Sequence, residues 1–149
     1  MPESDATTAR PADPLPSAAA QPRPLRILLA DDDEINRAIV GHLLAPLPNT
    51  VLTEAGDGRA ALELAQTQRF DLMIFDLNMP EINGDRLIRH LRASRSLNAG
   101  SPMILFSAAT DRNGRIEGNR AATLADLVLP KPIPADTFLS AVEELTSRR

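Results

Sequence analysis

Residues 71–84 read DLMIFDLNMPEING, and this stretch decides the fold. Its apolar run Leu72–Phe75 is too short for a helix and bulky enough to be a buried strand. The run stops at Asp76, where a carboxylate must be hydrated, paired or bound to a metal. Pro80 prevents further strand pairing, and after Gly84 apolar residues recur at one-turn spacing. The stretch therefore predicts a strand–loop–helix unit with Asp76 at its mouth.

Four further units of the same kind flank this one. The other short apolar runs are Arg26–Ala30, Val51–Thr53, Met103–Phe106 and Leu127–Leu129. Segments with helical spacing follow them, at Ile35–Leu44, after the turn Gly56-Asp57-Gly58, at residues 111–123 and at Ala135–Ser147. Five such units predict an α/β fold, in which helices cover both faces of a parallel sheet.

Polar residues come within two positions of the end of four of the five runs. In sheets of this kind, ligands bind at the carboxyl ends of the strands, where the strand order reverses. The residues in question are Asp31, Asp32, Asp76, Ser107 and Lys131. The sequence therefore predicts three carboxylates, a hydroxyl and an ammonium at one edge of the sheet.

Three carboxylates in one place predict a hard divalent cation, because two of them about 4 Å apart repel by about 4 kcal/mol at an effective dielectric constant near 20. Mg²⁺ suits an oxygen-only ligand set, and the absence of Cys and of a neighbouring His argues against Zn²⁺. With part of the charge neutralised, Asp76 is a candidate nucleophile towards a phosphoryl group. Ser107 and Lys131 would then contact the phosphoryl oxygens.

Length and composition exclude several functional classes. The chain has 149 residues, which suits one domain. A net charge of −4 and the lack of Trp and Tyr argue against nucleic-acid binding. No apolar run is long enough for a membrane span, and no signal peptide is evident. Together with the absence of Cys, this predicts a cytoplasmic protein.

The first 24 residues differ in composition from the rest. They hold six of the 13 prolines, mixed with Ala, Ser and small polar residues, and show no periodicity. Such a segment buries too little apolar surface to offset its ordering entropy. We therefore expect a disordered tail at residues 1–24 and a folded domain at residues 25–149.

Four motifs together resemble the receiver domain of two-component response regulators. They are DD at 31–32, DLNMPEINGD at 76–85, SA at 107–108 and KP at 131–132. The resemblance implies a flavodoxin-like, doubly wound sheet of five parallel strands in the order 2-1-3-4-5. It also implies that a histidine kinase or a histidine phosphotransfer protein phosphorylates Asp76. Phosphorylation would switch the binding of a downstream protein partner, with no turnover of a separate substrate.

The resemblance implies a role for each residue of the metal site. Asp32 and Asp76 are direct ligands of Mg²⁺. Asp31 acts on the ion through water, and Asn78 supplies its backbone carbonyl.

It also implies the phosphoryl contacts. Ser107 is the switch hydroxyl with Ala108 beside it, and Lys131 pairs with the phosphoryl group before a cis peptide to Pro132. The aromatic residue that the family places three residues before the Lys is Val128 here, which is too small and too stiff at χ1 to take that part.

Without that aromatic residue, we expect the signal to be read from the loops near the acceptor and from the first predicted helix. In this helix, Ile35, Ile39 and Leu43 are expected to face the core. Asn36 and Arg37 are expected to be free to meet a partner.

The other polar candidates are assigned structural roles. Asp33 is expected to cap the first helix, and His42 and His90 are expected at the surface. Arg112, Arg115 and Arg120 are expected to form a solvated face.

Several functions remain open from the sequence. The favoured one is a stand-alone response regulator. The receiver domain of a hybrid histidine kinase, or a phosphorelay intermediate, is the alternative, because ADDDEINR at 30–37 resembles those receivers. Asp31-x-Asp33 weakly resembles the nucleophile motif of haloacid-dehalogenase-type phosphatases, which gives an enzymatic alternative. A scaffold that works without phosphorylation is the last.

Overall fold

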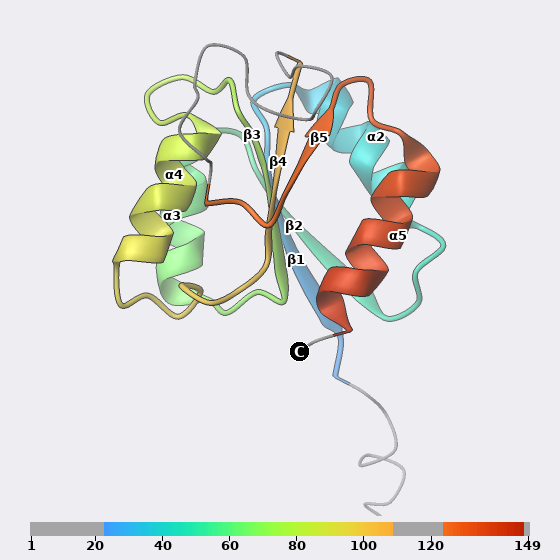
Figure 1. The fold of residues 1–149 in the computed structure, drawn as a ribbon, viewed down its shortest axis with the longest axis horizontal. Helices are drawn as coiled ribbons and strands as arrows, with labels where there is room; N and C mark the ends of the chain where they lie inside the picture. Colours follow the sequence, from blue (N-terminus) through green and yellow to red (C-terminus); the bar gives the residue numbers. More distant parts are fainter. Residues whose placement is uncertain (1–22, 109–123, 148–149) are drawn as a thin grey trace, which may run out of the picture.

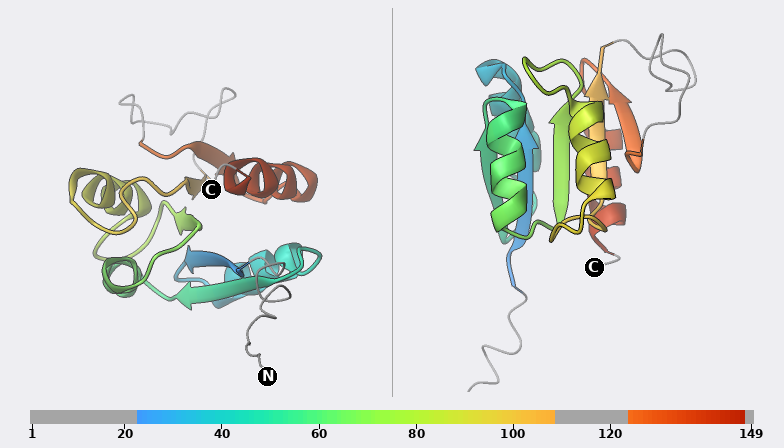
Figure 2. Two further views of the ribbon diagram at one scale, coloured as in Figure 1. Left: turned by 90° about the horizontal axis from the view of Figure 1, so that it is seen from below. Right: turned by 90° about the vertical axis from the view of Figure 1, so that its left-hand side faces the viewer.

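The computed structural model describes residues 23–108 and 124–147. Five parallel strands form one sheet in the order β2-β1-β3-β4-β5, as predicted. The strands are β1 (Leu25–Ala30), β2 (Thr50–Ala55), β3 (Leu72–Asp76), β4 (Met103–Ser107) and β5 (Leu127–Pro130). The helices are α2 (Glu34–Leu44), α3 (Gly58–Thr67), α4 (Gly84–Ala93) and α5 (Ala135–Thr146). Helices α3 and α4 cover one face of the sheet, and α2 and α5 cover the other (Figures 1 and 2).

The sheet separates two apolar layers, and alternate residues of a strand point into different layers. In β3, Met73 and Phe75 belong to the layer that contains residues of α3 and α4. Leu72 and Ile74 belong to the layer that contains residues of α2 and α5. All four side chains are fully buried. This burial on both sides explains why β3 reads as a continuous apolar run.

Three helices begin with side-chain caps. Asp33 accepts a hydrogen bond from the N–H of Ile35, as its predicted role requires. Asp57 caps α3 and Asn83 caps α4 in the same way. Each cap satisfies one of the N–H groups that a helix leaves unpaired at its first turn. These helices follow β1, β2 and β3, so all three caps lie at the carboxyl edge of the sheet.

The prediction for the inner face of α2 is wrong in part. Ile35 is 70% exposed and Ile39 is 45% exposed, whereas Val40 and Leu44 are buried. Leu43 is half-buried and packs beside them. Both sets of residues recur at the same spacing, so the apolar period alone does not say which set faces the sheet. In the structure, the first turn of α2 also turns a polar residue, Arg37, towards the domain.

That first turn faces the domain with a polar side chain. Arg37 lies three residues before Val40, on the inner side, and it contacts both Asp31 and Glu54. The expectation that Arg37 is free for a partner is therefore wrong, and Asn36 is half-buried. A guanidinium group is favourable here because the acid-rich edge of the sheet lies beside the start of α2.

Some sequence expectations lie outside the described residues. They are the helix at 111–123, with its three arginines, and nearly all of the N-terminal tail. His42 and His90 are exposed, as predicted. None of the helices in the described ranges is both long and apolar enough to cross a membrane.

Gly41 sits inside α2 and gives a test of how α2 packs on β2. A Cβ atom built there would lie 3.7 Å from Cδ2 of Leu52, an ordinary contact. Gly costs about 1 kcal/mol relative to Ala inside a helix, so Gly41→Ala is expected to raise the free energy of unfolding by about 0.5–1 kcal/mol. Urea denaturation measures this. A loss of stability would mean that α2 lies closer to the sheet than the structure shows.

Candidate functional site

The carboxyl ends of four neighbouring strands bring the predicted residues to one edge. Asp31 follows β1, Asp76 ends β3, Ser107 ends β4 and Lys131 follows β5. The register pairs Asp76 with Phe106 in the neighbouring strand. This edge includes the point between β1 and β3 where the strand order reverses, which is the usual ligand position in such sheets.

Three carboxylates meet at this edge. Asp31, Asp32 and Asp76 each offer an oxygen atom, and these atoms all lie within 4.8 Å of one another. Asp31 and Asp76 are buried and Asp32 is exposed. Burying two charges of the same sign is unfavourable unless cations or hydrogen-bond donors compensate them.

Lys131 supplies one positive charge to the cluster. Its Nζ lies 2.7 Å from Oδ1 of Asp76 and 3.6 Å from Oδ2 of Asp31. The peptide bond between Lys131 and Pro132 is cis. One ammonium group faces three carboxylates, so the cluster keeps negative charge that Lys131 alone does not balance.

The titration of the pair reflects this arrangement. Burial raises the pKa of the Asp76 carboxyl, and the charges of Asp31 and Asp32 raise it further, against the hydrogen bond from Lys131. Burial lowers the pKa of Lys131, but its hydrogen bond and attraction to Asp76, with the charge of Asp31, outweigh burial and leave that pKa above its ordinary value. Lys131 is therefore a fixed positive charge at neutral pH.

One oxygen atom of the cluster indicates a further cation. Oδ2 of Asp31 is buried and accepts no hydrogen bond from residues 23–108 or 124–147. Oδ1 of the same side chain accepts one from the N–H of Asp33. The ammonium group of Lys131 lies 3.6 Å from Oδ2 and is shared with Asp76. A buried carboxylate oxygen without a hydrogen bond is costly, and an oxygen-only ligand set suits Mg²⁺. Asp31, Asp32 and Asp76 therefore fit a hard divalent cation.

The remaining predicted residues lie on β4 and β5 and in the segments that follow β3 and β4. Ser107 is buried at the end of β4, and Ala108 beside it is exposed. Asn78 is exposed in the loop between β3 and α4. Val128, at the position of the expected aromatic residue, is half-buried against the layer that contains α3 and α4.

The loop after β3 is closed by backbone hydrogen bonds. The N–H of Leu77 donates to the carbonyl of Phe106, and the N–H of Gly84 donates to the carbonyl of Leu77. Glu81 adopts a positive φ of 69° within this loop, a conformation that few residues other than Gly adopt. These hydrogen bonds tie the residue after Asp76 to β4 and to the start of α4.

Sequence reasoning missed one residue at this edge, Arg37. Its Nη1 donates to the backbone carbonyl of Asp31 at 2.7 Å, and its Nε donates to Oε1 of Glu54 at 3.1 Å. The available signal was its spacing of three residues from Val40 and seven from Leu44, which places all three residues on one side of a helix.

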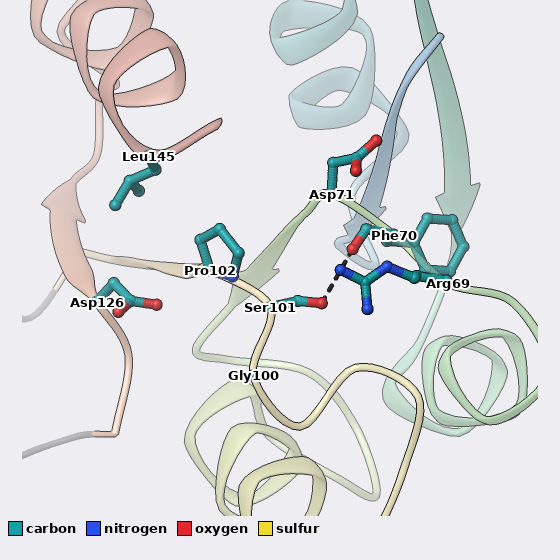
Figure 3. Close-up of a pocket in the computed structure, with 8 residues that line it drawn as sticks. All are labelled: Arg69, Phe70, Asp71, Gly100, Ser101, Pro102, Asp126 and Leu145. Atoms are coloured by element: carbon teal, nitrogen blue, oxygen red, sulfur yellow. Dashed lines mark hydrogen bonds between the residues drawn. The ribbon is translucent and has the colours of Figure 1, made fainter. Parts of the chain in front are cut away.

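A cavity at the opposite edge of the sheet contains none of the predicted site residues (Figure 3). Its volume is about 230 Å³, and Asp71 and Asp126 are the acids among its lining residues. Asp71 accepts a hydrogen bond from the N–H of Arg26. Asp126 accepts bonds from the N–H of Met103 and from Arg92. These carboxylates hold the fold together, so the carboxyl edge is the candidate site.

Comparisons with known proteins identify the family of the domain that carries this edge. The model of the response regulator receiver domain matches residues 27–143. The chain is 32% identical over 124 residues to the chemotaxis protein CheY of Pseudomonas aeruginosa, which covers 83% of this chain and 98% of that protein. It is 35% identical over 124 residues to the sensor protein EvgS of Escherichia coli O157:H7, which covers 83% of this chain and 10% of EvgS. The solved structure of the chemotaxis response regulator CheY4 of Vibrio cholerae aligns with a TM-score of 0.70 at 30% identity, covering 82% of this chain and 98% of that one.

Proposed function

Because this chain belongs to the response regulator receiver family, we propose that it accepts a phosphoryl group on Asp76 and passes that event to a protein partner. The observation that carries the proposal is the setting of the Asp76 carboxylate. It is buried, it is hydrogen-bonded to Lys131, and oxygen atoms of Asp31 and Asp32 lie within 4.8 Å. A nucleophilic carboxylate needs this combination of fixed orientation and nearby cationic charge.

Asp31, Asp32 and Asp76 would hold Mg²⁺, together with the backbone carbonyl of Asn78. When bound, the ion supplies positive charge that offsets the repulsion between the acids and the negative phosphoryl oxygens. The buried Oδ2 of Asp31, which lacks a hydrogen-bond donor among the described residues, supports this assignment.

The chain's own residues then perform the transfer. An oxygen of Asp76 attacks phosphorus, the bond between phosphorus and the donor's histidine nitrogen breaks, and that nitrogen keeps the electron pair. Lys131 orients the Asp76 carboxylate through the 2.7 Å hydrogen bond and offers its charge to the phosphoryl oxygens. The hydroxyl of Ser107 is the second group proposed to contact those oxygens, with Ala108 beside it.

The phosphatase alternative is disfavoured by the structure around Asp33. The second acid of an Asp-x-Asp pair must face the substrate, but Oδ1 of Asp33 accepts a hydrogen bond from the N–H of Ile35 at 2.9 Å and caps α2. We therefore expect no turnover of a separate substrate. The relatives include both CheY, which this chain nearly spans, and EvgS, of which it spans a tenth. A response regulator and a receiver domain of a hybrid kinase or phosphorelay thus share the same proposed chemistry.

The test uses acetyl phosphate as the donor. With Mg²⁺ present, the chain should gain one phosphoryl group that is stable in acid and labile in base, and EDTA should prevent this. Intact mass spectrometry measures the stoichiometry. Hydrolysis of a phosphomonoester well beyond one equivalent per chain would instead support the phosphatase.

The exposed side of α2 is the proposed docking surface for a protein donor, a histidine kinase or a histidine phosphotransfer protein. Ile35 and Ile39 are exposed there, in the first two turns of the helix that follows Asp31 and Asp32. Burying an isoleucine contributes about 1.5–3 kcal/mol, so Ile39→Ser is expected to slow phosphotransfer from a protein donor by roughly tenfold. A phosphohistidine protein that phosphorylates the unaltered chain serves as the donor.

Val51 provides the matched control. It lies on β2 and is 45% exposed, as is Ile39, so Val51→Ser removes a similar apolar surface elsewhere. Transfer from the protein donor should stay near the wild-type rate in Val51→Ser. Equal losses in the two variants would contradict docking on α2.

A further inference from the structure

Arg37 joins three segments at the carboxyl edge of the sheet. From α2, its Nη1 donates to the backbone carbonyl of Asp31 at 2.7 Å. Its Nε donates to Glu54, near the end of β2, at 3.1 Å. The Arg37 side chain is 20% exposed, against 49% for Glu54. The hydrogen bond to Asp31 is thus better shielded from water than the one to Glu54, and Asp31 is the first acid of the cluster.

The Asp31 backbone is held on both sides. Its N–H donates to the carbonyl of Ala55 at 3.1 Å, and its carbonyl accepts from Arg37. That carbonyl belongs to the peptide group that joins Asp31 to Asp32, and a peptide group is planar. A hydrogen bond to this oxygen therefore restrains the plane of the peptide group that leads to Asp32. Asp32 is itself exposed, and the orientation of this peptide plane sets the position from which its side chain starts.

We propose that Arg37 is a positioning residue for the cation site, which sets the affinity for Mg²⁺ by orienting the peptide between Asp31 and Asp32. The inference rests on the proposed function, since it concerns the same site. Groups that orient metal ligands change metal affinity by about 10–100-fold when they are removed.

The direction in which the affinity for Mg²⁺ changes when Arg37 is replaced separates a positioning role from a simple charge effect. A guanidinium group repels a divalent cation, so removing its charge should strengthen Mg²⁺ binding if charge were its main contribution. Loss of orientation should weaken binding instead. Arg37→Lys keeps the charge but lacks the planar fork that reaches two acceptors at once. Any weakening in Arg37→Lys therefore reports position and not charge.

The experiment measures the Kd for Mn²⁺ by electron paramagnetic resonance and for Mg²⁺ by calorimetry, because the chain has no Trp or Tyr to report binding by fluorescence. Arg37→Ala is expected to raise Kd about tenfold, and Arg37→Lys several-fold. Arg92→Ala is the matched control. Like Arg37, Arg92 donates both to backbone carbonyls and to a carboxylate. It does so at the opposite edge of the sheet, where it contacts the carbonyls of Ala99 and Ser101 and the side chain of Asp126. The Kd of Arg92→Ala for each ion should equal that of the wild type.

Each other outcome is decisive. If Arg37→Lys binds both ions as tightly as the wild type, or Arg37→Ala binds more tightly, the inference is overturned. An equal loss in Arg92→Ala would assign the effect to stability in general and overturn it too. If Arg37→Ala fails to fold, the Lys variant alone decides. Failure of the wild type to bind either ion would refute the metal site of the proposed function itself.

Discussion

Asp76→Asn is expected to abolish phosphoryl acceptance while leaving the chain folded. The amide has nearly the shape of the carboxylate but no anionic oxygen to attack phosphorus. Burial already raises the pKa of the Asp76 carboxyl, so the neutral amide suits the folded interior. Lys131 keeps a carboxylate neighbour in Asp31, 3.6 Å away. The measurement is intact mass after incubation with acetyl phosphate and Mg²⁺, with circular dichroism to verify the fold.

Asp57→Asn is the matched control for this variant. Asp57 is another acid at the carboxyl edge, but its carboxylate caps α3 through the N–H of Ala60, and Asn caps helices about as well as Asp. Asp57→Asn should therefore accept one phosphoryl group at the wild-type rate. The assignment of Asp76 is wrong if Asp76→Asn is phosphorylated as fast as the wild type, or if a different acid carries the group in the unaltered chain.

Much of the fold followed from local patterns. The run Leu72–Phe75 is continuous because β3 is buried on both faces, and the acids at the strand ends had to meet because parallel strands share their carboxyl edge. The strand order itself came from the resemblance to a family. Residues 71–84 carried most of this information, since they combine a buried strand, a charged strand end and the cap of the next helix.

The orientation of α2 did not follow from such patterns. Ile35 and Ile39 repeat every four residues, as do Val40 and Leu44, so either pair satisfies an amphipathic helix. The face that turns inward also carries Arg37, which contacts Asp31 six residues before it and Glu54 17 residues after it. A tertiary hydrogen bond to a backbone carbonyl leaves no mark in the apolar period. Ile35 and Ile39 are exposed on the opposite side of α2, in the helix that follows Asp31 and Asp32.

The contacts of α2 bear on how a partner would recognise the phosphorylated state. An aspartyl phosphate adds negative charge and strong acceptor oxygens at the cluster. Val128 is half-buried and has no ring to rotate, so we still expect readout near the loops around Asp76 and at α2. Arg37 now gives that expectation a physical link, because it ties the Asp31 backbone to α2. Hydrogen exchange, compared with and without a beryllofluoride mimic of the phosphoryl group, measures whether protection changes at α2 and in these loops.

Gly84→Ala is expected to destabilise the domain by about 3 kcal/mol, because overpacking against backbone leaves little room to relax. An added Cβ would overlap the carbonyl oxygen of Asp76 and lie 2.7 Å from Cδ1 of Leu105. Gly84 is the first residue of α4, and its N–H bonds to the carbonyl of Leu77. The methyl group would therefore separate α4 from β3 or displace Asp76. The loss exceeds the helix-propensity gain of up to about 1 kcal/mol that Ala brings.

Gly100→Ala controls for the substitution itself, since a Cβ there would meet nothing within 4 Å. Urea midpoints at an unchanged m-value should place Gly100→Ala within about 1 kcal/mol of the wild type. Gly84→Ala should fall well below both, and it should accept phosphate from acetyl phosphate more slowly because the displaced backbone carries the acceptor. Gly41→Ala makes the same chemical change with the opposite expected sign. The three variants therefore compare the room available for a Cβ atom at each position, since the chemical change is the same. Equal stability of Gly84→Ala and Gly100→Ala would mean that α4 does not press on the Asp76 carbonyl.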